Sequence, residues 1–131
     1  MSCVYLSSED VLVIADHACD DMQVVVRDAG LLESAVHRPS AAMFGQEAYP
    51  DLIDKAAALL QSLANNHLRS FFDGNKRTAW LSCVTFLAMN GVDLRLDIDA
   101  AERLVIDVAT GEADEIKTIS DGLRGLVVDQ V

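Results

Sequence analysis

The chain has 131 residues, of which 51% are hydrophobic, so it can fold as a single domain (residues 1–131) around its own core. Its formal net charge of −11 argues against direct nucleic-acid binding, because phosphate backbones bind to surfaces rich in Lys and Arg. Three cysteines without a CxxC pair predict reduced thiols in a cytoplasmic protein, not a zinc site or a disulfide framework. The sequence shows neither a signal-peptide pattern nor an apolar run long enough to cross a membrane.

The N-terminal part contains two predicted helices and one irregular segment. Acids at the start of an apolar pattern of helical period predict a helix over residues 8–20. A second helix is expected over 31–36 and ends before the first proline, because a residue that precedes proline avoids the α region. Residues 38–50 contain a proline at each end of the segment and are expected to be irregular.

The rest of the chain carries stronger helical patterns. A helix begins at Pro50-Asp51, and its apolar face, which includes Leu60 and Leu63, extends to His67. Three more helices are expected, over about 75–89, 98–109 and 114–126. Short β segments are compatible with residues 4–6, 23–27 and 92–96. The sequence therefore predicts a mainly α fold, a compact bundle of about six helices with at most minor β segments.

The segment NNHLRSFFDGNKRTAW, residues 65–80, leads into the predicted helix over 75–89 and is rich in polar groups. The first turn of a helix presents unpaired N–H groups and a partial positive charge, and both attract anions. Gly74 would let the backbone approach a phosphate closely, and Lys76 and Arg77 would add cationic donors. This helix start therefore predicts a phosphate site.

Two further side chains of this segment suggest chemistry. Asp73 would repel a bound phosphate unless a divalent cation such as Mg²⁺ lay between them. His67 lies upstream and could act as general base on a hydroxyl, which predicts phosphoryl transfer. A simpler interpretation is also open: Asp-Gly-Asn is a common turn, Asp73 could cap the helix, and Lys76 and Arg77 could be solvated.

His67 and residues 71–79, FFDGNKRTA, resemble the signature of the Fic/Doc family. The resemblance is closest to the Doc branch, whose pattern is H-x-F-x-D-[GA]-N-K-R-T-A. Further stretches resemble the family in the same order along the chain: 30–39, 49–52, 86–91 and 109–112. The resemblance implies the fold of that family and the function of its Doc branch, the toxins of toxin–antitoxin pairs.

Doc-type proteins transfer phosphate from Mg²⁺-ATP to a threonine hydroxyl of a Tu-type translation elongation factor, so the resemblance implies ATP and Mg²⁺ as cofactors. It also implies a Phd-like antitoxin as partner, with a disordered segment that folds into a groove on the toxin. The implied site residues are His67 as the base, Asp73 as the metal-linked acid, and Gly74, Asn75, Lys76 and Arg77 as phosphate binders.

The sequence departs from the family pattern in the spacing of its histidine. His67 stands six positions before Asp73, whereas the family histidine stands four before, and the residue at that position here is Arg69. Either two residues are inserted after His67, or Arg69 replaces the catalytic histidine. An insertion is favoured because His67 continues the helical face of Leu60 and Leu63.

Two other positions bear on the type of transfer. The AMP-transferring Fic branch usually has a small residue where this chain has Lys76, and a second arginine where it has Trp80. Both are Doc-like features and favour phosphate transfer. The alternatives are an AMP transferase, or a catalytically impaired binding module that keeps the family fold with its base displaced.

Overall fold

The structure is a computed structural model that describes residues 2–19, 24–65, 68, 70–71 and 74–128. Its α-helices in this part of the chain are α1 (Ser8–Ala18), α2 (Ala29–His37), α3 (Leu52–Ala64), α4 (Asn75–Met89), α5 (Ile98–Thr110) and α6 (Ile116–Arg124). A 3-10 helix, η1 (Arg38–Ser40), and two short strands, β1 (Ala42–Met43) and β2 (Gln46–Glu47), lie between α2 and α3. The predicted mainly α fold is confirmed.

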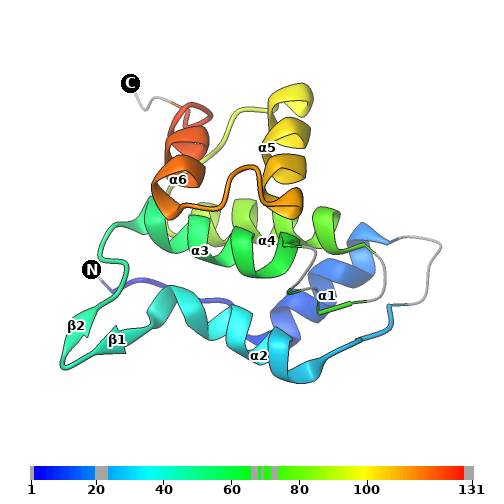
Figure 1. Cartoon of the computed structure of the whole chain (residues 1–131), viewed down its shortest axis with the longest axis horizontal. Coiled ribbons are helices and arrows are strands. Elements are labelled where there is room, and N and C mark those ends of the chain that lie inside the picture. Colours follow the sequence, from blue (N-terminus) through cyan, green and yellow to red (C-terminus); the bar gives the residue numbers. More distant parts are fainter. Residues whose placement is uncertain (1, 20–23, 66–67, 69, 72–73, 129–131) are drawn as a thin grey trace.

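The helices form three layers (Figure 1). Helices α3 and α4 run antiparallel through the middle, α5 and α6 cover one side, and α1 and α2 cover the other. Helix α3 contacts all the other α-helices except α1 extensively, so it is the centre of the bundle.

Helix α3 is buried on nearly all sides because its sequence is apolar around most of its circumference. Ala56, Ala57 and Ala58 are fully buried, and their small side chains allow neighbouring helices to pack closely. Leu59 and Leu60, which follow these alanines in the helix, are buried as well. A helix that is apolar all round is expected in the interior of a domain.

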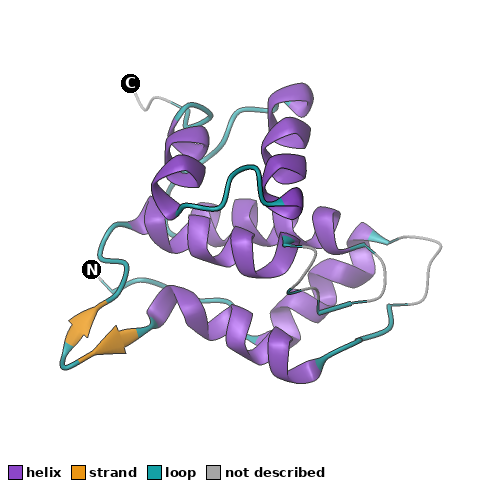
Figure 2. Ribbon diagram, viewed as in Figure 1, coloured by secondary structure: helices purple, strands orange, loops and turns teal. Residues whose placement is uncertain are grey.

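The β structure differs from the prediction. The only described sheet is the antiparallel β1–β2 hairpin within residues 38–50, which were expected to be irregular (Figure 2). The hairpin forms because Phe44 and Gly45 both adopt positive φ, 53° and 78°, as a tight two-residue hairpin turn requires.

The three predicted β segments do not form strands in the part of the chain that the structure describes. Residues 4–6 do not pair with a described strand. Instead, the backbone of Val4 donates to and accepts from the side-chain amide of Asn90. The other two segments contribute one isolated bridge each, Val26 to Phe71 and Leu94 to Val127. The strand predictions are therefore wrong, because β propensity without a neighbouring strand does not produce a sheet.

The core contains a thiol whose titration affects stability. Cys83 of α4 is fully buried, and its Sγ lies 3.8 Å from the carbonyl oxygen of Ala56 on α3. Burial raises the pKa of Cys83 from 9.0 to about 12. The folded protein therefore keeps this thiol neutral at a pH at which the unfolded chain ionises it.

We predict that the free energy of unfolding falls as the pH rises above 9.0, since only the unfolded chain then releases the Cys83 proton. The contribution is about 1.4 kcal/mol for each pH unit above the unfolded pKa. Burial also raises the pKa of Tyr5, which adds a smaller loss of the same sign. Urea denaturation at about pH 8 and about pH 10 measures the difference.

The variant Cys83→Ser should lose most of this pH dependence, because a hydroxyl does not titrate in this range. Cys3→Ser changes a thiol that is only partly buried and serves as the matched control. Equal pH dependence in Cys83→Ser and the unmodified protein would contradict the assignment.

Candidate functional site

The start of α4 holds four of the six predicted site residues. Gly74 is the N-cap of the helix, and Asn75, Lys76 and Arg77 form its first turn. His67 and Asp73, the predicted base and metal-linked acid, lie outside the described residues, as does Arg69. Their roles remain predictions.

Helix α3 ends earlier than the sequence suggested. It ends at Ala64, and Asn65 adopts extended backbone with φ −61° and ψ 129°. The prediction that the face of Leu60 and Leu63 continues to His67 is wrong, because the asparagine run that follows Ala64 has low helix propensity. The helical face therefore no longer favours an insertion after His67 over a replacement by Arg69.

Gly74 is required by both its backbone and its surroundings. Its φ of 79° and ψ of 11° are left-handed, a conformation that L side chains rarely adopt. A Cβ at this position would lie 2.3 Å from Sγ of Cys19, the buried C-cap residue of α1. The end of α1 therefore packs directly against the start of α4, and a Cβ at position 74 would force Sγ of Cys19 to move.

The side chain of Asn75 anchors the loop that precedes α4. Its Oδ1 accepts from the backbone N–H of Phe71 at 3.1 Å, and its Nδ2 donates to the Phe71 carbonyl at 2.7 Å. One residue earlier, the Ser70 carbonyl accepts from the backbone N–H groups of Arg27 and Asp28. Sequence reasoning assigned Asn75 to phosphate binding and missed this contact, in which both polar atoms of its side-chain amide bond to Phe71.

The charge at the start of α4 is the reverse of the usual arrangement. The first turns of α1, α3 and α5 carry acids, whereas the first turn of α4 carries Lys76 and Arg77 and no acid. Both side chains are exposed, and neither belongs to an ion pair among the described residues. Because a helix N-terminus is itself partially positive, two cations there favour a bound anion.

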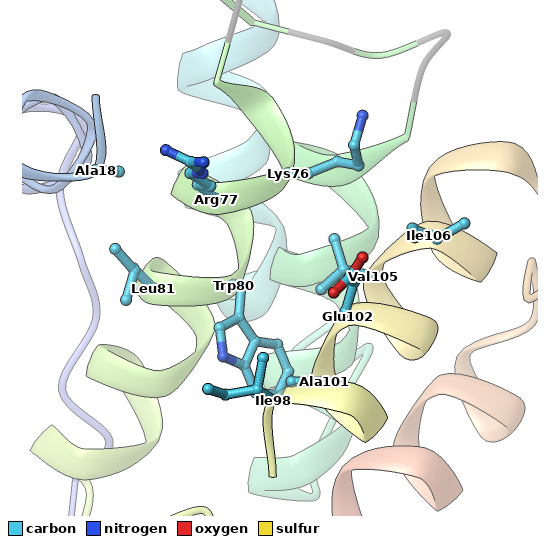
Figure 3. A pocket seen from close by; sticks show the side chains of 10 residues that line it. All are labelled: Ala18, Lys76, Arg77, Trp80, Leu81, Ile98, Ala101, Glu102, Val105 and Ile106. Atoms are coloured by element: carbon cyan, nitrogen blue, oxygen red, sulfur yellow. The ribbon is translucent and has the colours of Figure 1, made fainter. Parts of the chain in front are cut away.

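A cavity of about 600 Å³ lies beside this helix start, within the size range of small-molecule sites. In Figure 3, Lys76 and Arg77 lie at one end of the cavity, and Trp80 and Ile98 lie toward the other. The lining comes from three helices: Ala18 of α1; Lys76, Arg77, Trp80 and Leu81 of α4; and Ile98, Ala101, Glu102, Val105 and Ile106 of α5. The site thus joins a cationic end to a mostly apolar groove.

The described part of the chain also bears on metal binding and on membrane spanning. It contains no group of three or more His, Cys, Asp or Glu side chains that could hold a metal ion. Asp73, the predicted Mg²⁺ ligand, lies outside the described residues, so the Mg²⁺ site stays a prediction. No described helix combines the length and apolar character needed to cross a membrane.

Known proteins match most of this chain. Residues 5–87 match the Fic/DOC family. Toxin Doc of Mycolicibacterium smegmatis is 54% identical over 123 residues, which cover 92% of each protein. Protein kinase doc of Escherichia phage P1 is 35% identical over 99 residues, which cover 76% of this chain and 75% of the phage protein. These matches confirm the resemblance inferred from the loop before α4.

The fit of Gly74 against Cys19 makes a testable prediction. Gly74→Ala should destabilise the protein by about 1–2 kcal/mol for the left-handed backbone and by about 1–3 kcal/mol more for the contact with Cys19. Gly111→Ala is the matched control, because Gly111 has a φ of 88° but no atom within 4 Å of an added Cβ. Urea denaturation gives both values.

The double variant Cys19→Ala/Gly74→Ala separates the two causes. Removing Sγ relieves the contact but not the backbone strain, so the cost of Gly74→Ala in this background should fall to that of Gly111→Ala. The same cost with and without Sγ would show that the two residues do not interact.

Proposed function

Because this chain belongs to the Fic/Doc family, we propose that it is a Doc-type toxin that transfers the γ-phosphate of Mg²⁺-ATP to a protein hydroxyl. The observation that carries the proposal is the reversed charge at the start of α4, where Lys76 and Arg77 lie unpaired among the described residues. The names of the two relatives, a toxin and a protein kinase, support the same activity. The proposed substrate is a translation elongation factor of the Tu type, so the toxin would arrest translation in the cytoplasm.

Each site residue has a distinct task in this proposal. Backbone N–H groups in the first turn of α4 bind phosphate oxygens, and the glycine at the cap keeps that approach open. Lys76 and Arg77 neutralise the charge that develops on the transferred group. Asp73 would hold Mg²⁺, which supplies further charge neutralisation between the carboxylate and the phosphates.

In this proposal, the transfer is a displacement at the γ-phosphorus. The substrate hydroxyl oxygen forms the new P–O bond while the bond from the γ-phosphorus to the bridging oxygen breaks, and ADP leaves. His67 accepts the hydroxyl proton. Lys76 and Trp80 resemble the Doc branch at positions that distinguish it from the AMP-transferring branch, so the γ-phosphate is proposed as the transferred group.

The apolar part of the cavity between α4 and α5 is proposed to hold a segment of a Phd-like antitoxin. Trp80, Ile98 and Val105 offer the kind of surface that accepts the apolar face of a helix that folds on binding. A segment bound there would lie next to Lys76 and Arg77. This proximity would couple antitoxin binding to inhibition of the site.

The proposed transfer is tested by incubating the protein with a purified Tu-type elongation factor and ATP labelled at either the γ- or the α-phosphate. The measured quantity is the label that becomes attached to the elongation factor. We expect label from the γ-phosphate only, and a loss of about 100-fold or more in His67→Ala. Lys117→Met removes an exposed cation on α6 and should leave transfer unchanged. Label from the α-phosphate would instead support an AMP transferase.

Nucleotide binding is measured separately by the fluorescence of Trp80, which is the single tryptophan of the chain and lines the cavity. Mg²⁺-ATP should change its emission, and Arg77→Gln should weaken binding about tenfold through the loss of one charge-assisted contact. Binding without any transfer would support the impaired binding module. Equal transfer by His67→Ala and the unmodified protein would contradict His67 as the base.

A further inference from the structure

A second cavity, of about 430 Å³, lies between α2 and the C-terminal end of α3. It shares no lining residue with the cavity beside α4. Leu31, Ser34 and Arg38 line it from the α2 side, and Ser62 lines it from α3. Leu68, from the loop that contains the predicted base, also lines it, so the cavity adjoins that loop.

Arg38 is half-buried in this cavity and has only neutral hydrogen-bond partners in the described chain. Its Nε donates to the Tyr49 hydroxyl at 3.1 Å, and its Nη1 donates to Ser62 Oγ at 3.0 Å and to the Ala58 carbonyl at 3.4 Å. The guanidinium also lies over the Tyr49 ring, with its central carbon 5.6 Å from the ring centroid. These bonds leave the Nη2 group available to an additional acceptor.

No acidic side chain among the described residues pairs with Arg38, although the whole chain has 21 Asp and Glu residues. Glu33, which lies on the same helix as the cavity wall, pairs with His37 instead. Withdrawing a charge from water without an opposite charge costs free energy. A bound oxyanion would recover that cost through a charge-assisted hydrogen bond.

The guanidinium of Arg38 is positioned indirectly by Lys55, through the contacts of Tyr49. Buried Lys55 of α3 donates to the Tyr49 carbonyl and, at 3.0 Å, to Glu47 Oε1 of the hairpin. Burial opposes the charge of Lys55, but the hydrogen bond to Glu47 and the neighbouring Tyr5 outweigh it and raise the pKa of Lys55 above its usual value. Lys55 therefore fixes Tyr49, and Tyr49 in turn positions Arg38.

We propose that Arg38 and Ser62 form a binding site for the carboxylate of an acidic side chain presented by the protein substrate. A carboxylate fits because the cavity has one cation and apolar walls at Leu31 and Leu68, whereas phosphate sites commonly combine several cationic donors. Ser62 Oγ accepts from Arg38, so its own proton is free to donate to the same anion. The assignment to the protein substrate rests on the proposed function, because the cavity borders the loop of the predicted base.

Binding is tested first without any enzymatic assay. N-acetyl-glutamate N-methylamide is titrated into the ¹⁵N-labelled full-length protein, with NMR signals of the cavity residues as the readout. We expect saturable shifts that weaken at least about tenfold in Arg38→Gln. Arg95→Gln, which removes an exposed guanidinium bonded to the Gly125 carbonyl, is the matched control and should bind as the unmodified protein does.

A second variant covers the case in which Arg38→Gln does not fold. Ser34 is exposed at the cavity wall, so Ser34→Glu places a carboxylate beside Arg38 without removing any buried contact. Ser34→Glu should bind the probe at least about tenfold more weakly than the neutral variant Ser34→Gln does. No saturable shift, equal binding of the glutamine analogue, or tighter binding of inorganic phosphate would overturn the carboxylate site.

The link to the substrate is tested by steady-state transfer to the elongation factor. Ser34→Glu should raise KM for the protein substrate about tenfold, with a much smaller effect on kcat and on KM for ATP. Probe binding with no change in that KM would overturn the substrate assignment. Loss of all transfer by the unmodified protein, with probe binding intact, would refute the proposed function and leave the carboxylate site.

Discussion

Burial of α3 on nearly all sides is the constraint on which the rest of the structure depends. The run from Ala56 to Ala58 leaves no side chain to hold neighbouring helices apart, so the helices of all three layers pack close to this one. A helix enclosed in this way cannot shift without opening the core. The position of its last residue, Ala64, is therefore fixed, and so is the point at which the connection to α4 begins.

The few polar side chains buried in α3 connect this core to the surface features. Lys55 reaches the hairpin and Tyr49, and Ser62 reaches Arg38. Each must have its hydrogen-bond partners in place, because a buried polar group without one is costly. The same helix thus packs the core and orients a guanidinium on the face beside the loop, while α4 presents its cations on another face.

The sequence predicted the helices well where they are bounded by strong local signals. The expected range of α4, about 75–89, matches the observed Asn75–Met89, because Gly74 precedes the helix and Asn90-Gly91 follows it. The hairpin was missed because Phe44 adopts positive φ, which bulky side chains rarely do. The anchoring role of Asn75 and the partners of Arg38 could not be read from a pattern, since they depend on contacts between distant segments, such as Arg38 with Ser62.

The anchoring of Ser70 and Phe71 has a consequence for how related proteins can differ in length. Backbone bonds from the start of α2 and the Asn75 amide tie this dipeptide to the scaffold. Residues gained or lost before Ser70 would be absorbed locally, without disturbing the geometry of the glycine cap that follows. Related chains can then gain or lose residues between α3 and Ser70 by insertion or deletion while the start of α4 stays unaltered.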